Sequence, residues 1–281
     1  MPNGGKWPKI SIVTPSYNHG PFIEETIRSV LLQNYPNIEY IITDGCSTDN
    51  SVSIIKKYEP WLSYWSSEKD IGQANAINKG FQKSSGNILA WLNSDDMLAP
   101  NCLMKAIPFL SQKSVGAVYG NRGIIDAKSN LKKIVKGMPF FRWQFKFRCG
   151  IPQETVFLEK KYFTRVGGLD EKLHFALDYD LWLRISRLTD FYYIPEVLGY
   201  WREHKLSKSV LVKNRHLTNK NVENMMKEFD YVQNKNLGRI SSYIEKSIYM
   251  FIYELLRSAY NKKQLKKAFH FLYELSPKPF R

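Results

Sequence analysis

Short apolar runs alternate with amphipathic stretches over the first hundred residues. Runs that are hydrophobic on both faces predict buried strands of a parallel sheet, here at residues 10–13, 39–43, 62–66 and 88–92. Between them, helices are predicted over residues 22–34, from the cap residues 47–50 through 58, and over 74–83. Strand-helix alternation at this spacing implies right-handed crossovers. The pattern therefore predicts an α/β protein with a doubly wound, mostly parallel sheet flanked by helices.

The remainder of the chain is less regular. A strand at 115–119, a hairpin over 123–135, a helix over 178–188 and a short strand at 191–194 are predicted. From residue 212 onward, two or three amphipathic helices are expected, joined near Gly238 and Asn261. We therefore expect a main domain over residues 1–211 and a basic helical extension over 212–281.

Charge is unevenly distributed along the chain. The formal net charge is +15, and residues 213–281 carry 14 Lys/Arg against 6 Asp/Glu. Aromatic residues interleave with these cations, a composition that suits a helix on an anionic bilayer. A solvated basic face, or packing on the main domain or on a second subunit, explains the same pattern. Peripheral contact with an anionic membrane is thus one of several hypotheses for the extension.

Targeting signals and cysteine frameworks are not recognisable in the sequence. No apolar stretch reaches the ~18 residues of a membrane span, and the first residues lack a signal-peptide pattern. Cys46, Cys102 and Cys149 are too scattered for a disulfide framework or a zinc site. A cytoplasmic protein with reduced thiols is the expectation.

Polar clusters follow three of the predicted strands, at residues 15–18, 44–45 and 93–96. Ligands of parallel sheets bind at the carboxyl ends of strands, so these clusters are expected to converge. Asp95 and Asp96 would repel each other unless a cation sits between them, and hard divalent cations take oxygen ligands. Tyr17 could stack on a base, and Asp44 could accept a hydrogen bond from a ring N–H. Taken singly, each has a structural explanation as a helix cap, a turn or a core residue.

The order and spacing of eight segments resemble the successive signatures of family 2 glycosyltransferases with the GT-A fold. These segments are 14–18 (TPSYN), 44–49 (DGCSTD), 68–75 (EKDIGQAN), 93–96 (NSDD), 153–157 (QETVF), 167–171 (GGLDE), 178–184 (DYDLWLR) and 200–204 (YWREH). The likeness spans roughly residues 8–210 and does not include the extension. It implies a GT-A catalytic domain over 1–211.

The resemblance also implies roles for individual residues. Nucleotide-binding positions would be Pro15, Tyr17, Asn18, Asp44, Gln73, Asn75, Ser94 and Asp95. A Mg²⁺ or Mn²⁺ ion would be held by Asp95, Asp96 and His204. Asp178 matches the catalytic base with Asp180 as the fallback, and Arg202 or Gln153 would reach the diphosphate or the acceptor. Two departures stand out: Asn93 replaces a third acid, and Leu177 precedes Asp178 where the family commonly has an acid.

The implied reaction explains why such side chains are needed. An acceptor hydroxyl must lose its proton as it attacks the anomeric carbon, which calls for a positioned carboxylate. The departing nucleoside diphosphate gains negative charge, which a cation neutralises. The resemblance implies transfer with inversion (EC 2.4) from a nucleotide sugar, with a UDP-sugar favoured. The acceptor would be a glycan or a lipid-linked acceptor in surface polysaccharide or glycoconjugate synthesis.

Other classes of protein account for less of the sequence. A nucleic-acid-binding protein would explain the charge, but acids at strand ends would repel phosphate without a metal. A nucleotidyltransferase would need a glycine-rich, basic loop after the first strand, and a Rossmann dehydrogenase would need G-x-G-x-x-G there; neither is present. An inactive family member remains an alternative, although the acids are retained.

Overall fold

A computed structural model describes residues 6–110, 115–142, 145, 150–205, 207–208 and 219–237. Cys149 and the part of the predicted extension beyond Leu237, with its expected helices and interleaved aromatic residues, lie outside the described residues. In the part that is described, no helix is both long and apolar enough to cross a bilayer.

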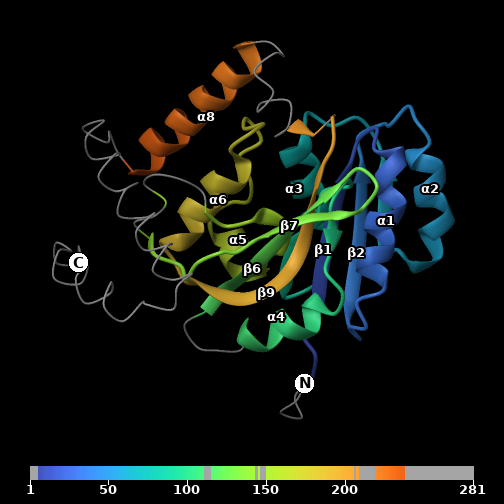
Figure 1. Cartoon of the computed structure of the whole chain (residues 1–281), viewed down its shortest axis with the longest axis horizontal. Coiled ribbons are helices and arrows are strands. Elements are labelled where there is room, and N and C mark those ends of the chain that lie inside the picture. Colours follow the sequence, from blue (N-terminus) through green and yellow to red (C-terminus); the bar gives the residue numbers. More distant parts are fainter. Residues whose placement is uncertain are drawn as a thin grey trace.

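The centre of the molecule is a nine-stranded mixed sheet in the order β3-β2-β1-β4-β8-β6-β9-β5, with β7 paired to β6 (Figure 1). The strands are β1 (Ile10–Ser16), β2 (Ile38–Asp44), β3 (Tyr64–Ser67), β4 (Ile88–Trp91), β5 (Met97–Leu98), β6 (Val115–Asp126), β7 (Leu131–Val135), β8 (Phe157–Glu159) and β9 (Asp190–Glu203). β1 is parallel to β2 and β4, and β2 is parallel to β3. The antiparallel strand β8 separates this parallel half from the parallel pair of β6 and β9.

Helices cover both faces of the sheet and bury two apolar cores. The helices are α1 (Gly20–Leu31), α2 (Ser51–Tyr58), α3 (Gln73–Lys83), α4 (Cys102–Leu110), α5 (Lys160–Arg165), α6 (Leu177–Ser186) and α8 (Asn219–Leu237), with short 3-10 turns η1 (Glu59–Trp61) and η3 (Gln153–Thr155). One core joins α1, α2 and α4 to the sheet, and the other joins α3, α6 and α8. Both faces of the parallel strands are therefore buried, as expected for strands whose residues are apolar on both faces.

The predicted alternation of strands and helices in the first hundred residues is confirmed, with boundaries shifted by a few residues. The hairpin predicted over 123–135 is formed by β6 and β7. β9 is much longer than the strand expected at 191–194. Its register with β6 shifts between Ile194 and Val197, so Pro195 falls in an irregularity where its missing N–H costs no ladder bond. The extra length carries the chain to His204.

The extension predicted from residue 212 is not structurally separate over residues 219–237. α8 lies beside α6 (Figure 1), and its Val232 is fully buried in the same core as Trp182 of α6. This helix therefore packs on the main domain, which is one of the alternatives left open by its sequence.

Candidate active site

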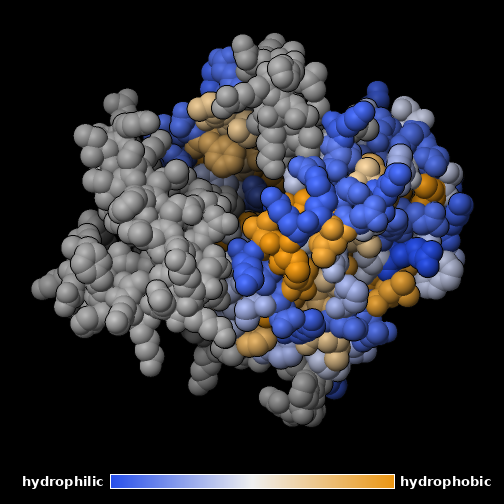
Figure 2. Space-filling view, in the orientation of Figure 1, coloured by the Kyte–Doolittle hydropathy of each residue, from blue (hydrophilic) through white to orange (hydrophobic). Residues whose placement is uncertain are grey.

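A cavity of about 1250 Å³ opens over the carboxyl ends of β1 and β4 and beside the start of α6. Binding sites for one small molecule typically have volumes of about 300–1,000 Å³, so this cavity has room for two ligands. The ends of β1 and β2 lie side by side, because Ser16 pairs with Asp44 in the sheet. Figure 2 shows apolar side chains in the region of α8.

Pro15 near the end of β1, and Tyr17 and Asn18 just after β1, line the cavity as the sequence predicts. Tyr17 is 60% exposed, so a face of its ring is free for stacking. Asn18 has a positive φ of 53° and accepts the backbone N–H of Thr48 through its Oδ1 at 2.8 Å. The loop after β1 is thereby fixed against the loop after β2, and Tyr17 is presented to the cavity.

Asp44 holds a loop instead of facing the cavity, contrary to the prediction that it contacts a base. Its carboxylate accepts the Oγ–H of Ser47 at 2.5 Å, the N–H of Ser47 at 2.9 Å and the hydroxyl of Ser67 at 2.7 Å. It is 2% exposed, and the described residues that line the cavity do not include it. Asp44 therefore acts on the cavity through the loop that carries Gly45 and Cys46.

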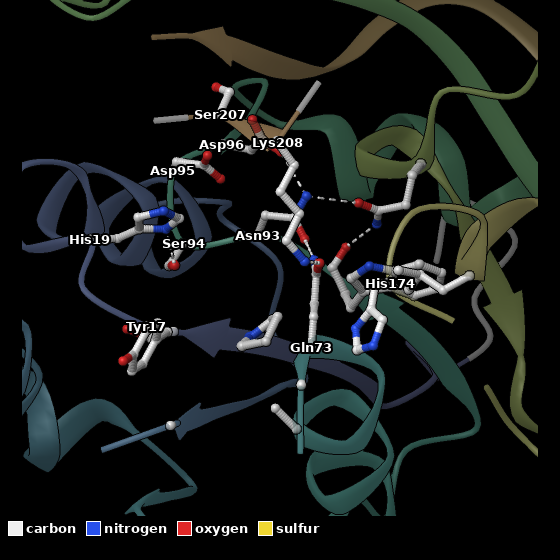
Figure 3. A pocket seen from close by; sticks show the side chains of 18 of the residues that line it. Tyr17, His19, Gln73, Asn93, Ser94, Asp95, Asp96, His174, Ser207 and Lys208 are labelled. Atoms are coloured by element: carbon white, nitrogen blue, oxygen red, sulfur yellow. Dashed lines mark hydrogen bonds between the residues drawn. The ribbon is translucent and has the colours of Figure 1, made fainter. Parts of the chain in front are cut away.

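Asp95, His19 and His204 place their ligand atoms within 4.8 Å of one another. Nε2 of His204 lies 2.9 Å from Oδ2 of Asp95, and Nδ1 of His19 lies 2.7 Å from Oγ of Ser94. Figure 3 shows His19, Ser94 and Asp95 together at one side of the cavity. Two imidazoles and a carboxylate are a donor set that a divalent cation such as Mn²⁺ accepts.

Charge around Asp95 favours its ionised form. Burial raises the pKa of Asp95, but the hydrogen bond from His204 and the charges of His19 and His204 lower it below its ordinary value. Burial is also the main cause of the lowered pKa of His19. A negative Asp95 beside His19, whose pKa is lowered, is suited to binding a cation, because metal ligands must be deprotonated.

Asp96 borders the cavity, but its carboxylate is buried and hydrogen-bonded within the protein, so the geometry differs from the predicted set of metal ligands. Its carboxylate accepts the backbone N–H of Arg202 at 2.9 Å and the side-chain amide of Asn93 at 3.1 Å. Burial, and next the charge of Asp95, raise the pKa of Asp96 well above its ordinary value. Among the described residues, His19 takes the third position in the cluster that Asp96 was predicted to hold.

Arg202 is fully buried and does not reach the cavity, which corrects the prediction that it contacts a diphosphate. Its guanidinium donates to Glu25 at 2.6 Å and to the backbone oxygen of Asp95 at 2.8 Å. Lys208 does line the cavity, and its Nζ donates to Oε1 of Gln73 at 3.0 Å (Figure 3). Burial lowers the pKa of Lys208, and the charge of Asp95 opposes this.

Three amide side chains form a hydrogen-bonded chain along the cavity wall. Gln73 donates to Oδ1 of Asn93 at 2.7 Å, and Asn93 donates to Oε1 of Gln153 at 3.3 Å. All three line the cavity, as predicted for Gln73 and Gln153. Asn75 does not: its amide donates to Glu171 at 2.9 Å, so it ties α3 to the loop before α6.

Asp178 lies in the first turn of α6 and lines the cavity. Burial raises the pKa of Asp178 to about 6, while the N–H of Tyr179 and the charge of Arg122 act in the opposite direction. Arg122 also lines the cavity and is held by a two-pronged ion pair with Glu154, with Nε 2.6 Å from Oε1. A carboxyl with a pKa near neutrality in a cavity is suited to accept a proton.

Asp180 is excluded as the fallback base. It is fully buried, accepts the Nε–H of Arg184 at 2.8 Å and the side-chain amide of Asn236 at 3.0 Å, and does not border the cavity. Its role in the described structure is to join α6 to α8.

The sequence-based predictions missed several cavity residues, namely His19, Arg122, His174 and Lys208. His19 had a usable signal, because it directly follows the polar cluster that ends β1. Arg122 lies in the interior of a strand, and its approach to Asp178 depends on pairing between distant segments. Lys208 belongs to no predicted helix or strand.

Comparisons with known proteins agree with this geometry. The model of the glycosyl transferase family 2 matches residues 11–175. An uncharacterized glycosyltransferase of Rickettsia typhi is 32% identical over 209 residues, which cover 70% of this chain and 64% of that protein. The chain thus spans less than two thirds of this relative's length.

Two solved structures share the fold. The crystal structure of S. aureus TarS (residues 1–349) with UDP-GlcNAc has a TM-score of 0.61 at 16% identity, covering 81% of this chain and 73% of that chain. The mannosyltransferase PcManGT of Pyrobaculum calidifontis with GDP-Man and Mn²⁺ has a TM-score of 0.58 at 16% identity, covering 94% and 85%. The fold is therefore of the GT-A type.

The match over residues 11–175 covers more than half of the chain, and it includes the strand-end residues of the cavity. The chain belongs to the glycosyl transferase family 2.

Proposed function

We propose that the chain transfers a sugar from a nucleotide diphosphate donor, a UDP-sugar by preference, to an acceptor hydroxyl with inversion. The observation that carries the proposal is that one cavity is lined by the exposed Tyr17, by His19 and Asp95 of the candidate metal site, and by Asp178, whose pKa is raised to about 6. Family membership, and the nucleotide sugars bound to TarS and PcManGT, support it.

The donor would bind between Tyr17 and Lys208. The base stacks on the free face of the Tyr17 ring, and the ammonium of Lys208 faces the diphosphate. Lys208 lines the cavity and no ion pair of it is found among the described residues, so its charge is available to an anionic ligand. A cation held by His19, Asp95 and His204 would supply further positive charge for the leaving diphosphate.

Asp178 would act as the base. The acceptor oxygen forms a bond to the anomeric carbon while the bond from that carbon to the diphosphate oxygen breaks. The hydroxyl proton passes to the Asp178 carboxylate, and the nucleoside diphosphate departs with the electron pair. A single displacement of this kind inverts the anomeric carbon and needs no nucleophilic side chain.

The acceptor class we propose is a glycan or a lipid-linked acceptor of surface polysaccharide or glycoconjugate synthesis. The cavity volume supports a second substrate beside the donor, because a nucleotide sugar alone does not need all of it.

A thermal-shift screen with UDP-, GDP- and dTDP-sugars, each with and without Mn²⁺, tests the donor assignment. We expect one base class to raise the melting temperature, and Mn²⁺ to increase that rise. Release of the nucleoside diphosphate from the best donor then tests turnover. If no sugar nucleotide stabilises the protein with the metal present, the proposed function is wrong.

A further inference from the structure

Helix α8 is anchored to the segment that leads into Asp178. The carboxylate of Glu228 accepts the backbone N–H groups of His174 at 3.0 Å, Phe175 at 2.7 Å and Ala176 at 3.1 Å. These bonds satisfy N–H groups just before α6, where a helix leaves its donors unpaired. α8 is therefore fixed in position relative to the cavity wall that carries the proposed base.

Aromatic packing reinforces this attachment. The ring of Phe229 stacks on Tyr179, the residue after Asp178, with centroids 5.4 Å apart and planes inclined by 25°. Tyr179 is fully buried, so its position is determined by the core. One face of the Phe229 ring thus packs on Tyr179 of the core, while the residue also borders the cavity.

One face of α8 contributes apolar side chains to the cavity. Met225 and Phe229 are four residues apart, so they project from the same face, and both line the cavity. Met226, the next residue along the helix, is 60% exposed and does not line it. The face of α8 that meets the cavity is therefore apolar.

The cavity wall around Asp178 combines the charged pair of Arg122 and Glu154 with apolar side chains. Besides Met225 and Phe229, its apolar lining there comes from Ile151, Phe175 and Leu177. The loops near Tyr17 instead contribute polar and charged lining residues, Asn18, Thr48, Lys69 and Asp70. A nucleotide diphosphate matches the polar part, and the apolar part is left to a different ligand.

We propose that Met225 and Phe229 of α8, together with Ile151, Phe175 and Leu177, form an acceptor subsite for molecules that carry an apolar group next to the reacting hydroxyl. The inference rests on the proposed function, because it takes Asp178 as the group that receives the acceptor proton. It narrows the acceptor to an amphiphile, such as a lipid-linked glycan, and gives α8 a role in substrate selection.

Calorimetric titration with methyl, butyl, hexyl and octyl β-glucosides, each below its micelle concentration, tests the subsite without requiring turnover. The wild-type protein should bind more tightly with each added methylene, by roughly two- to fourfold while the chain remains within the subsite. Met225→Gln places a polar group of similar length in the wall, and it should flatten this dependence. Met226→Gln makes the same change on the exposed side of the helix and should leave the dependence intact.

The inference would be overturned if the affinity of the wild type did not change with chain length. It would also be overturned if Met225→Gln, with an unchanged melting temperature, gained as much affinity per methylene as the wild type. The proposed function fails separately, through the absence of sugar-nucleotide binding and of diphosphate release. If the protein binds sugar nucleotides but its affinity for the glucosides does not depend on alkyl-chain length, the proposed function stands and the proposed subsite is wrong.

Discussion

Replacing Asp178 with Asn removes the proposed base and preserves its shape. The Asn oxygen can still accept the N–H of Tyr179, which Asp178 accepts at 2.8 Å. General-base catalysis contributes about 10²–10⁴-fold, so release of nucleoside diphosphate should fall by that factor, or roughly 3–5 kcal/mol in activation free energy. Affinity for UDP in the presence of Mn²⁺ should change little, because no proton is transferred when the donor binds.

The pH dependence of the wild-type rate is a second test of Asp178 as the base. The base must be ionised, and the pKa of Asp178 is about 6. The rate should therefore rise about tenfold per pH unit up to roughly pH 6 and level off above it. Asp178→Asn should lose this rise and keep only a low residual rate.

The same substitution should stabilise the protein at high pH. The pKa of Asp178 is raised from 3.8 to about 6 in the folded state, so its contribution to stability is fully present below pH 3.8 and is lost as the pH rises through 6. Asn carries no charge to bury. At pH 8 the variant should gain up to roughly 3 kcal/mol in unfolding free energy relative to wild type, as measured by urea denaturation.

Asp190→Asn, which neutralises an exposed acid paired with Arg142, is the control for both measurements. The base assignment is refuted if Asp178→Asn releases diphosphate within about threefold of the wild-type rate. A flat wild-type profile between pH 5 and 7 would contradict the raised pKa.

Four further substitutions probe the metal site, Lys208 and the α6–α8 junction. Lys208→Met should weaken UDP binding about tenfold while leaving uridine binding unchanged, which calorimetry can compare directly. His19→Asn and His204→Asn should each lower Mn²⁺ affinity roughly tenfold or more in titrations followed by electron paramagnetic resonance, and equal affinity in His19→Asn would remove it from the site. Asp180→Asn should cost about 3 kcal/mol in urea unfolding, because Arg184 loses its buried partner, and an unchanged midpoint would contradict that role.

The fold was predictable because its signal is local and periodic. Four apolar runs with amphipathic stretches between them specify parallel strands and crossover helices, and strand ends follow from those runs. Pro15, Tyr17 and Asp95 could be assigned to one edge of the sheet for this reason. The strand predicted at 191–194 is shorter than β9, because β9 continues past Pro195. Its register with β6 shifts at this point, and no local sequence pattern indicates that shift.

The errors in the site have different physical causes. Asp178 and Asp180 differ by two residues, or about 200° around a helix, so only one of them can face the cavity, and this was deducible from the sequence. The burial of Arg202 depends on Glu25, which is distant in the sequence, and was not deducible. The lining of the cavity by α8 was not deducible either. It depends on the hydrogen bonds of Glu228 to the segment before α6, which is also distant in the sequence.

The proposed function requires a metal-assisted nucleotide site around Asp95. Calorimetric titration of UDP into wild type and Asp95→Asn, each with and without Mn²⁺, tests for this site. We expect Mn²⁺ to tighten UDP binding to the wild type by about tenfold or more and to leave UDP binding to Asp95→Asn unchanged. Equal enhancement by Mn²⁺ in both proteins, or no binding of UDP to the wild type, would contradict it.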